Sequence, residues 1–550
     1  MHTSPDELTR GHALTGRSLV SGAAPTDTSR RFFHAVNPST GESLEPAYEA
    51  ATPDDVERAA RAAEAAFRPF SNVPNADRAA FLKFCAAELE GVADPLVHRA
   101  MQETALPEAR LRAELTRTIH QFHLFADAVL EGSWRDARID LPQPQRAPVP
   151  KPDVRSLLIP LGPVVVFGAS NFPLAFSVPG GDTVSAFAAG CPVIVKAHPA
   201  HPGTSELAGQ ALVRAVRRAG LPDGVFSLLF DDGVTVGVAL TQHPAVKAVA
   251  FTGSRQGGLA LVQAAQARSE PIPVYAELGS VNPIVFTAAA LQAGADRLVA
   301  GLAGSICGSI GQLCTQPGLL FVPVGEVGDA FLAGVASRLA QVPAAAMLTE
   351  RIHVAYTRGL EGLALHADVQ PVPPPDAPAG PSGRPGRAVS AHLFQTTTES
   401  VTRDAELTQE LFGPVSVAVR YDDMQEVVEA MRGLEGQLTA TVHAAPHELP
   451  ALEALLDAMR ARAGRVVLNG FPTGVEVGHA MMHGGPFPAT SDGRSTSVGT
   501  RAMLRFTRPL AYQDFPDGAL PLELRNENPL GIQRLVDGQP TREPVPPPPA

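Results

Sequence analysis

The sequence predicts an α/β protein built on a parallel sheet that helices cover on both faces. Short β-branched runs, such as 164–167 and 193–195, alternate with helical stretches between residues 157 and 286, which is the pattern of a parallel sheet with crossover helices. The first of these runs is apolar throughout, as expected of a strand buried on both faces. Upstream, residues 53–130 carry Ala, Leu and Phe at three- and four-residue spacing, which predicts helices alone.

The elements follow in order from local signals. The turn after the first strand leads into a helix that we expect to end at Gly190, because glycine readily takes the left-handed conformation after a last helical turn. The next helix is predicted to run from Gly203 to Gly220, with Thr204 or Ser205 as its N-terminal cap. Further strands are predicted at 226–230, 246–251 and 274–278.

Composition excludes several classes of protein. The 550 residues are 45% hydrophobic and 18% charged, which allows a large core and excludes disorder for most of the chain. A net charge of -12 argues against nucleic acid as a partner. The longest nearly apolar run, 184–195, is too short to span a bilayer, and the first thirty residues lack a signal peptide, so no membrane association is expected. Four cysteines are too few for a disulfide scaffold, so we expect a cytoplasmic protein.

Two proline-rich segments are expected to lie outside the folded core. Residues 371–386 read as a long surface loop. Residues 544–550 read as an extended tail, and we expect 531–550 as a whole to be disordered.

Three motifs place chemically useful side chains in turns. They are FGASNFP (167–173), YAELGSVNP (275–283) and GSIGQLCTQPG (308–318). The first two put Asn171 and Glu277 at the ends of predicted strands, and the third puts Cys314 in a glycine-rich turn. Parallel sheets bind ligands beyond the carboxyl ends of their strands, so these positions suit a site. The usual GxGxxG dinucleotide fingerprint is absent.

Together and in this order, the motifs resemble the NAD(P)-dependent aldehyde dehydrogenase superfamily over residues 33–515. AVNPSTGE (35–42), FTGS (251–254) and QELFGPVSV (409–417) extend the resemblance. It implies a Rossmann-type parallel-sheet cofactor domain, an α/β catalytic domain and a small β oligomerisation arm. It also implies NAD or NADP as cofactor, a small aldehyde as substrate, and a homodimer or homotetramer. No metal is expected.

The resemblance sets the expected domain boundaries. They are an N-terminal segment at 1–32, a cofactor domain at 33–134 and 152–278, a catalytic domain at 279–485, and an arm at 135–151 and 503–515.

Oxidation of an aldehyde through a thiohemiacetal and a thioester requires a nucleophile, an oxyanion donor and a base. Cys314 is the expected nucleophile, and because a thiol is mostly protonated at neutral pH, a base or backbone amides must assist it. The Asn171 amide and the Cys314 backbone N–H are the expected oxyanion donors. Glu277 is the expected base, with a pKa raised by burial. The resemblance leaves open whether Glu277 activates the thiol or the hydrolytic water. Cys85, Cys191 and Cys307 are interpreted as small buried hydrophobic residues.

The cofactor residues follow from the resemblance. Lys196 would meet the ribose hydroxyls, and Gly253 and Ser254 would lie under the pyrophosphate. Glu410 would bind the nicotinamide ribose, with Phe412 near the ring.

The choice between NAD and NADP depends on charge. Asp231 and Asp232 would repel a 2′-phosphate if they face it, whereas Lys196 and His198 would partly neutralise it. Val234 stands where related NADP users often carry an arginine. We expect use of both cofactors, with NAD no worse than NADP.

Two segments resemble one branch of the superfamily, the 2-oxoglutarate semialdehyde (2,5-dioxovalerate) dehydrogenases. They are residues 469–500, with RPLAYQDFP after them, and ETALPEARLRAELTRT (103–118). Ser280, where most relatives have a second glycine, suits the same branch. The expected reaction is oxidation of 2-oxoglutarate semialdehyde to 2-oxoglutarate. A long-chain aldehyde dehydrogenase is the alternative, followed by a catalytically silent protein with this fold. A cysteine hydrolase is disfavoured because no histidine motif lies near Cys314 in the sequence.

The carboxylate of such a substrate needs a cation in the tunnel, because burying it unpaired is costly. Arg110 and Arg117 lie seven residues apart on one face of a predicted helix, and Arg117 is our first choice. Arg494 is a third possibility, and Phe172 is expected to contact the substrate. The competing interpretation is that these arginines face solvent or pair with Glu114.

Overall fold

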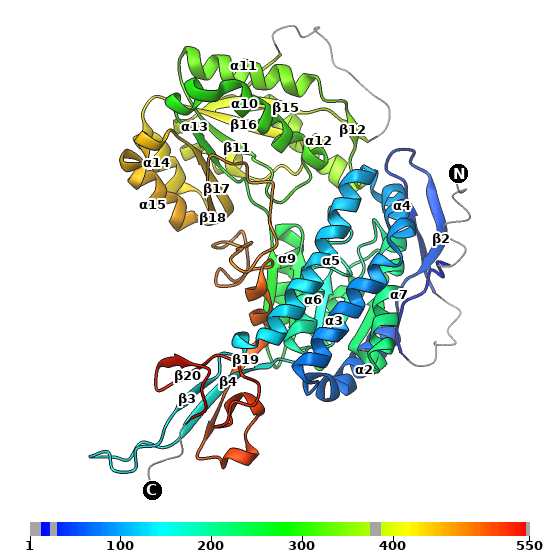
Figure 1. Cartoon of the computed structure of the whole chain (residues 1–550). Helices are drawn as coiled ribbons and strands as arrows, with labels where there is room; N and C mark the ends of the chain where they lie inside the picture. The colour runs from blue at the N-terminus through cyan, green and yellow to red at the C-terminus, as the bar shows by residue number, and fades with distance from the viewer. Residues whose placement is uncertain (1–12, 22–29, 375–386, 546–550) are drawn as a thin grey trace.

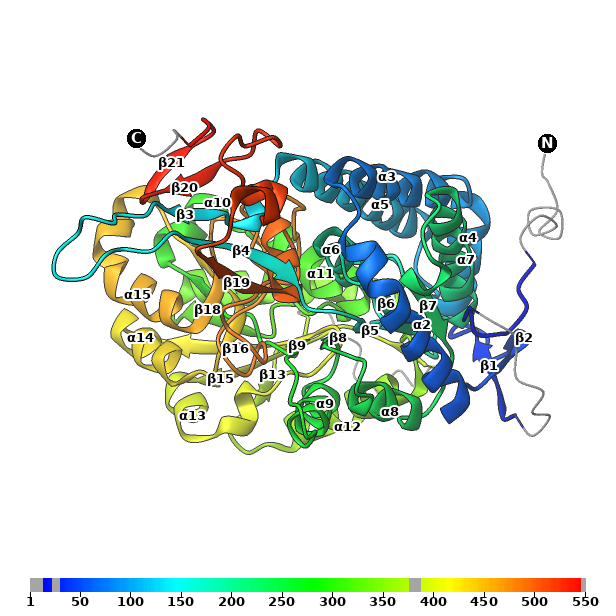
Figure 2. The same cartoon turned by 90° about the horizontal axis from the view of Figure 1, so that it is seen from below.

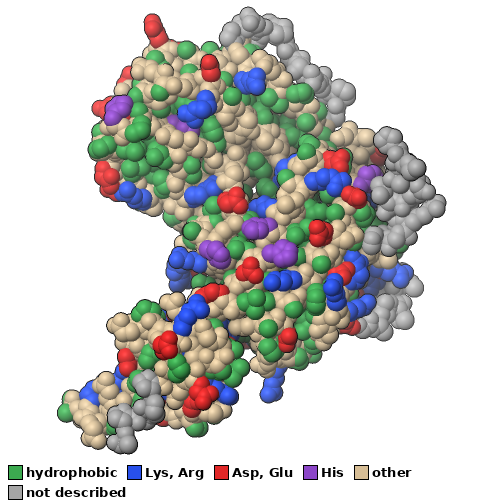
Figure 3. Space-filling model, viewed as in Figure 1, with side chains coloured by type: hydrophobic (Ala, Val, Ile, Leu, Met, Phe, Trp, Pro, Cys, Tyr) green, Lys and Arg blue, Asp and Glu red, His purple; other side chains and the backbone are tan. Residues whose placement is uncertain are grey.

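The computed structural model describes residues 13–21, 30–374 and 387–545. Two α/β bodies, each with its own central sheet, lie side by side, and a narrow β arm projects away from both (Figure 1). The α/β class with parallel sheets is thereby confirmed. Charges of both signs are mixed over the face drawn in Figure 3, with no continuous basic patch on that face.

The first body contains a five-stranded parallel sheet in the order β7-β6-β5-β8-β9. Its strands are β5 (Val164–Phe167), β6 (Val193–Lys196), β7 (Phe226–Leu229), β8 (Ala248–Thr252) and β9 (Val274–Glu277). The register pairs Phe167 with Lys196 and Thr252 with Glu277 at the carboxyl edge. The predicted strands therefore bring Lys196 and Glu277 to one edge of one sheet.

Helices cover both faces of this sheet (Figure 2). They are α2 (Pro53–Ser71), α3 (Asn75–Glu90), α4 (Ala93–Thr104), α5 (Glu108–Glu131), α6 (Gly181–Ala189), α7 (Pro202–Arg218), α8 (Thr235–Gln242) and α9 (Arg255–Gln266). α3, α5, α6 and α7 share one apolar core with alternate residues of β5 and β6, and α2, α8 and α9 share a second core with the other residues. Every β5 residue is buried, which explains its uniformly apolar sequence. Gly190 ends α6 with a φ of +94°, as predicted.

The cap of α7 differs from the prediction. The helix begins at Pro202, and neither Thr204 nor Ser205 caps it with its own side chain. The Glu103 carboxylate instead accepts hydrogen bonds of 2.8 Å from the backbone amides of Gly203 and Thr204. A carboxylate at this end also interacts favourably with the helix dipole. The cap comes from α4, about a hundred residues earlier in the chain.

The second body contains a seven-stranded sheet in the order β13-β15-β16-β11-β10-β17-β18, parallel except for the short edge strand β13. Its strands are β10 (Ile284–Phe286), β11 (Leu319–Pro323), β13 (Gln370–Pro371), β15 (His392–Thr397), β16 (Val415–Tyr421), β17 (Gln437–His443) and β18 (Ala463–Leu468). Its helices are α10 (Ala288–Cys307), α11 (Glu326–Ala340), α12 (Glu350–Leu365), α13 (Thr398–Arg403), α14 (Met424–Gly433) and α15 (Glu453–Arg462).

The arm is a five-stranded sheet in the order β19-β4-β3-β20-β21. Its strands are β3 (Arg138–Asp140), β4 (Val154–Pro160), β19 (Thr507–Gln513), β20 (Arg534–Val536) and β21 (Gln539–Thr541). β4 thus belongs to the arm rather than to the cofactor domain, because it pairs with β19 along its whole length.

The predicted disorder of 531–550 is wrong for residues 531–545. β20 pairs with β3, and the buried Arg534 side chain donates to the carbonyls of Arg525, Asn526 and Glu543. The pairing with the distant strand β3 and the local bonds of Arg534 hold a hairpin that its composition alone did not reveal. Residues 546–550, and residues 375–386 of the predicted surface loop, lie outside the described residues.

Two small antiparallel pairs complete the structure: β1 (Phe32–Val36) with β2 (Ser43–Glu49), and β12 (Ala345–Ala346) with β14 (Ala388–Val389). Within the described ranges, no helix is both long and apolar enough to cross a membrane.

Candidate active site

Cys314 stands in a turn that follows the 3-10 helix η3 (Gly308–Gly311). Ser309, Ile310 and Gly311 are consecutive residues with positive φ angles of 48°, 60° and 64°. Left-handed backbone costs a non-glycine residue about 1–2 kcal/mol, so this turn is strained and must be held by its surroundings. Position 311 requires glycine, because a Cβ there would overlap the backbone of Gly413 and Pro414.

A buried polar network holds the Cys314 turn in place. The Asn282 side-chain amide donates to the carbonyls of Cys314 and Gln316, at 2.8 and 2.9 Å. Ser280 donates to Gln437 at 2.8 Å and also contacts Asn282. Ser280 therefore ties the turn after β9 to the second sheet.

Asn171 lies beside the same turn. Its side-chain amide donates to the carbonyl of Gln312 at 3.0 Å, two residues before Cys314, and the residue is 8% exposed. The side-chain amide nitrogen carries a second N–H. This N–H can donate a hydrogen bond to an oxygen atom of a ligand that is attached to the Cys314 sulfur. The structure therefore brings Asn171 to Cys314, as predicted from the sequence.

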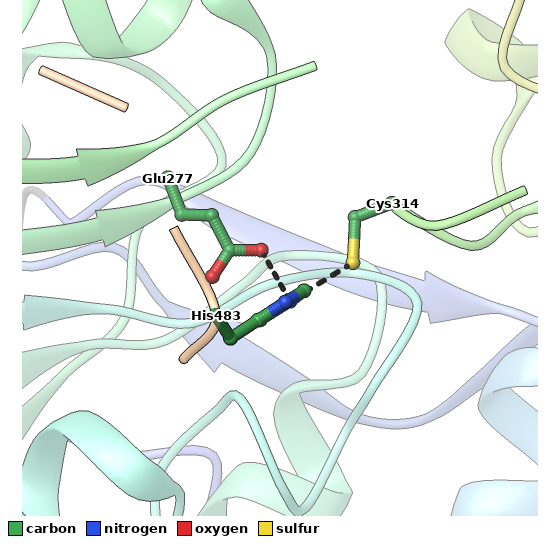
Figure 4. Close-up of side chains that lie close together, drawn as sticks. All are labelled: Glu277, Cys314 and His483. Carbon is green, nitrogen blue, oxygen red and sulfur yellow. Dashed lines mark hydrogen bonds and ion pairs between the residues drawn. The ribbon is translucent and has the colours of Figure 1, made fainter. Parts of the chain in front are cut away.

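His483 is the residue that sequence reasoning missed. Its Nε2 lies 3.4 Å from Cys314 Sγ and 3.0 Å from Glu277 Oε1, so the imidazole stands between the thiol and the carboxylate (Figure 4). It comes from the long loop after β18 and lies 169 residues from Cys314 in the chain. The backbone amide of His483 donates to Thr496, and its carbonyl accepts from the Ser497 amide, which fixes the loop.

The absence of a nearby histidine motif was the reason for disfavouring a cysteine hydrolase, and that reason fails. The histidine directly precedes Gly484–Gly485 within the segment that carried the branch resemblance. That position was the only sequence signal that pointed to it.

Glu277 is 3% exposed and accepts a hydrogen bond from Ser497. Burial alone would raise the pKa of its carboxyl, but His483, Ser497 and Cys314 outweigh burial, so the pKa is lowered. The expectation that burial would raise this pKa is therefore wrong. Burial, followed by the negative charges of Glu277 and Glu410, raises the pKa of the Cys314 thiol well above its usual value. The thiol is thus protonated at neutral pH, and its activation requires a base.

Two aromatic rings and two arginines form a wall near the thiol. The Arg110 guanidinium lies 4.5 Å from the Phe172 ring centre, and that of Arg117 lies 5.2 Å from the Phe176 ring centre. The two rings contact each other at 5.2 Å, and Phe176 is 5.9 Å from the His483 ring. Arg117 is close enough to Cys314 for their charges to interact.

Each of these arginines has an unsatisfied donor. Arg110 pairs with Glu114 at 2.6 Å and contacts Ser309, yet its buried Nη2 has no hydrogen-bond partner. Arg117 makes one long bond of 3.4 Å to the Val475 carbonyl, and its buried Nη1 has no partner. The expected alternative partner, Glu114, therefore belongs to Arg110.

Two other arginines bear on the same question. Arg494 pairs with Asp492 in its own loop, and its side chain is 91% exposed, so it does not reach the thiol. Arg465 on β18 was not predicted. It donates to the carbonyls of Pro472 and Gly474, and its charge interacts with Cys314.

Three of the predicted cofactor residues lie at the carboxyl edge of the first sheet, at the end of β6 and directly after β8. Gly253 and Ser254 are exposed at the start of α9, where Ser254 accepts from the Gly257 amide, and free backbone amides at such a helix end suit a pyrophosphate. Lys196, at the carboxyl end of β6, donates to the Asp231 carbonyl at 2.7 Å. Burial lowers the pKa of Lys196 to about 8.

Glu410 reaches across from the second body to the turn after β9. A Cβ at Gly279 would overlap the Glu410 carboxylate, so this approach requires glycine. Burial raises the pKa of the Glu410 carboxyl to about 7. Phe412 is half-buried two residues later.

The aspartates expected to repel a 2′-phosphate are paired. Arg31 makes ion pairs with Asp232 and, at 2.8 Å, with Asp231, a contact that sequence reasoning did not foresee. Burial, together with His201 and Lys196, holds the pKa of His198 well below its usual value, so His198 is uncharged and cannot neutralise a phosphate. Val234 is exposed.

The family model described as "Aldehyde dehydrogenase family" matches residues 25–507. The chain belongs to the aldehyde dehydrogenase family. It is therefore an oxidoreductase of the kind that uses a nicotinamide cofactor, which confirms the resemblance and excludes the hydrolase.

Curated relatives and solved structures agree with this assignment. The chain is 48% identical to "Alpha-ketoglutaric semialdehyde dehydrogenase 2" of Azospirillum brasilense over 96% of this chain and 99% of the relative. It is 40% identical to "Alpha-ketoglutaric semialdehyde dehydrogenase" of Acinetobacter baylyi over 96% and 98%. A betaine aldehyde dehydrogenase from Staphylococcus aureus, solved with NAD+, superposes with a TM-score of 0.77 at 17% identity, covering 92% of this chain and 98% of that one.

Proposed function

We propose that this enzyme oxidises 2-oxoglutarate semialdehyde (2,5-dioxopentanoate) to 2-oxoglutarate, with NAD or NADP as the hydride acceptor. The two curated relatives support this substrate by name. The observation that carries the proposal is the pair of arginines that stack on Phe172 and Phe176, next to the His483 ring. Among the described residues, Arg110 and Arg117 both keep a buried N–H without a partner. A buried, unsatisfied guanidinium is costly unless a ligand completes it, and a carboxylate is its natural complement.

Cys314 is the proposed nucleophile. Its sulfur attacks the aldehyde carbon, and the carbonyl oxygen becomes an oxyanion. We expect the second N–H of Asn171, whose amide is bonded to the Cys314 turn at Gln312, and the Cys314 backbone amide to bind this oxyanion. A bound nicotinamide cofactor would supply the hydride acceptor, so that this carbon could lose hydride and be oxidised. The product of this step is a thioester on Cys314.

His483 is the proposed proton acceptor for the Cys314 thiol. In the neutral tautomer that carries its proton on Nδ1, the lone pair of Nε2 is 3.4 Å from Sγ, so the S–H proton can pass to Nε2 as the thiolate forms. The resulting imidazolium lies 3.0 Å from Glu277 Oε1, whose negative charge stabilises it. Burial and two nearby carboxylates raise the pKa of the Cys314 thiol, and proton transfer to His483 would still allow the thiolate to form.

Glu277 is the proposed base for hydrolysis of the thioester. Its lowered pKa keeps the carboxylate charged at neutral pH, so it can accept a proton from the attacking water. The hydrogen bond from Ser497 orients the carboxylate. Glu277 thus has two roles, as a counter-ion for His483 during acylation and as a base during deacylation.

The cofactor proposal is dual use, with NAD no worse than NADP. Lys196 would bind the ribose hydroxyls, Gly253 and Ser254 the pyrophosphate, and Glu410 the nicotinamide ribose, with Phe412 beside the ring. Since Arg31 neutralises much of the charge of Asp231 and Asp232, these aspartates do not present two unpaired charges to a 2′-phosphate.

The remaining assignments concern the assembly. We propose that residues 33–134 and 161–278 form the cofactor domain and 279–485 the catalytic domain. We also propose that the β arm joins subunits into a homodimer or homotetramer. The four cysteines of the chain are free, which suits the cytoplasm.

Substrate comparison tests the proposal. Purified enzyme is assayed by NAD(P)H formation with 2-oxoglutarate semialdehyde, succinate semialdehyde, glutaraldehyde and decanal, each with NAD and with NADP. We expect the highest kcat/KM for 2-oxoglutarate semialdehyde and formation of 2-oxoglutarate. A preference for decanal would assign the chain to the long-chain enzymes instead.

A further inference from the structure

Three different metal-ligand atoms converge at the active site. Glu277, Cys314 and His483 each offer one such atom, and all three atoms lie within 4.8 Å of one another (Figure 4). The closer pairs are His483 Nε2 with Glu277 Oε1, at 3.0 Å, and with Cys314 Sγ, at 3.4 Å. Thiolate, imidazole and carboxylate are the three side-chain ligands that Zn²⁺ uses in proteins.

Two of the three ligand separations are close to those of tetrahedral zinc, and the third is within 4.8 Å. With Zn–S near 2.3 Å and Zn–N or Zn–O near 2.0–2.2 Å, tetrahedral ligands stand roughly 3.3–3.6 Å apart. The two measured separations differ from this range by a few tenths of an ångström at most, so small side-chain rotations would complete the geometry. Three protein ligands and a fourth open position are the arrangement of an open zinc site.

The ligands are held from three separate directions. Glu277 ends β9, the Cys314 turn is tied by Asn282, and the His483 loop is tied by Thr496. Pre-positioning of this kind lowers the conformational entropy cost of binding an ion. Cys314 is partly exposed, whereas Glu277 and His483 are buried, so an ion has access from the thiol side.

Charge also favours a dication. The thiolate and the Glu277 carboxylate together would neutralise the charge of Zn²⁺ in a buried setting. Zinc binding displaces the thiol proton: Zn²⁺ and the thiol give a zinc thiolate and one released H⁺. No oxidant or reductant is needed.

We propose that Cys314, His483 and Glu277 form a zinc site with an open fourth position, and that Zn²⁺ bound there reversibly inhibits the enzyme by occupying the nucleophile. Soft and borderline ligands select Zn²⁺ and Co²⁺ over Mg²⁺ and Ca²⁺. The inhibited state forms without substrate or cofactor, so the proposal stands independently of which aldehyde the enzyme oxidises.

Cobalt substitution tests the site directly. The full-length enzyme is titrated with Co²⁺, and its absorption is followed for a thiolate-to-cobalt charge-transfer band and for the intense visible bands of tetrahedral cobalt. Zn²⁺ is then added to displace the cobalt, and activity is measured before and after EDTA. We expect one ion per chain, displacement by Zn²⁺, loss of activity with Zn²⁺, and recovery with EDTA.

Variant enzymes distinguish Zn²⁺ binding at this site from Zn²⁺ binding elsewhere on the protein. His483→Gln and Glu277→Gln should each weaken Zn²⁺ binding on the order of a hundredfold, because each removes one of three ligands. His479→Gln and Cys307→Ser are matched controls, since His479 is exposed and bonded to Thr500, and Cys307 ends α10. Thermal unfolding and cofactor binding show whether each variant is folded.

Two results would overturn the proposal. One is a cobalt spectrum without a thiolate band. The other is unchanged Zn²⁺ affinity in folded His483→Gln and Glu277→Gln enzymes. If the Cys307→Ser enzyme alone lost the band, the wrong thiol would have been assigned.

Discussion

Replacing Arg117 with alanine tests how the enzyme recognises the substrate carboxylate. The side chain has one long bond to Val475, one stacking contact with Phe176 and a buried Nη1 without a partner. A carboxylate placed at Nη1 would gain a charge-assisted hydrogen bond that the free enzyme lacks. The substitution removes that bond and leaves the fold with few contacts to lose.

The size of the effect follows from these contacts. A hydrogen bond between charged groups contributes about 1.5–3 kcal/mol, and each ~1.4 kcal/mol is a factor of ten. Loss of Arg117 should therefore raise KM for 2-oxoglutarate semialdehyde roughly tenfold to a hundredfold. Arg110 lies on the same face of the helix and also has an N–H without a partner. It can bind the substrate carboxylate in place of Arg117, and this compensation sets the lower limit of the expected rise in KM.

The assay compares two substrates and a control variant. KM and kcat are measured by NAD(P)H formation with 2-oxoglutarate semialdehyde and with an uncharged aldehyde of similar length. Arg112→Ala is the matched control, because Arg112 is on the same helix but is exposed and paired with Glu108 and Asp94. Arg117→Ala should raise KM for the charged substrate only. Arg112→Ala should change KM for neither substrate. An equal loss with both substrates in Arg117→Ala would reduce Arg117 to a structural residue.

Three further predictions follow from the site. Glu277→Gln should give a burst of NAD(P)H followed by slow turnover, whereas His483→Gln should slow the burst itself and the alkylation of the thiol by iodoacetamide; equal burst rates in the two variants would refute the division of roles. Burial lowers the pKa of Lys196 to about 8, so its charge is present below that pH and lost above it. The Kd for NADP, followed by fluorescence quenching, should therefore rise up to about tenfold between about pH 7 and pH 9 in wild type but stay flat in Lys196→Arg; a flat wild-type profile would contradict this. Arg31→Ala leaves its two aspartate partners uncompensated, so kcat/KM should fall on the order of tenfold with NADP and much less with NAD. The exposed Arg17→Ala variant serves as control, and equal losses with both cofactors in Arg31→Ala would count against the charge argument.

Local patterns were sufficient to predict much of the fold. The run Val164–Phe167 is apolar because the strand is buried on both faces, and Gly190 ends its helix because the backbone there has positive φ. Asn171, Glu277 and Cys314 could be found because each stands at the end of a strand or in a turn after a strand or helix. The sheet register places Glu277 at the carboxyl edge of the first sheet, and a hydrogen bond joins Asn171 to the Cys314 turn.

The features that sequence reasoning missed all depend on distant parts of the chain. Glu103 caps α7 from another helix, and Arg31 neutralises two aspartates that lie 200 and 201 residues away. His483 comes from a loop without regular structure, so no periodicity marks it. The hairpin of β20 and β21, in a segment whose composition suggests disorder, pairs with β3 from far earlier in the chain. Such contacts are set by tertiary packing, which neither composition nor spacing records.

The central claim is that a 2-oxoglutaryl group becomes bound to Cys314 during turnover, and mass spectrometry of the trapped intermediate tests it most directly. Enzyme mixed with 2-oxoglutarate semialdehyde and cofactor is quenched rapidly in acid, and its peptides are analysed for a thioester. We expect the 2-oxoglutaryl mass on the peptide that contains Cys314, at a higher level in Glu277→Gln than in wild type, and none on the peptide that contains Cys307. An adduct on Cys307, or no adduct while NAD(P)H forms at full rate, would contradict the account.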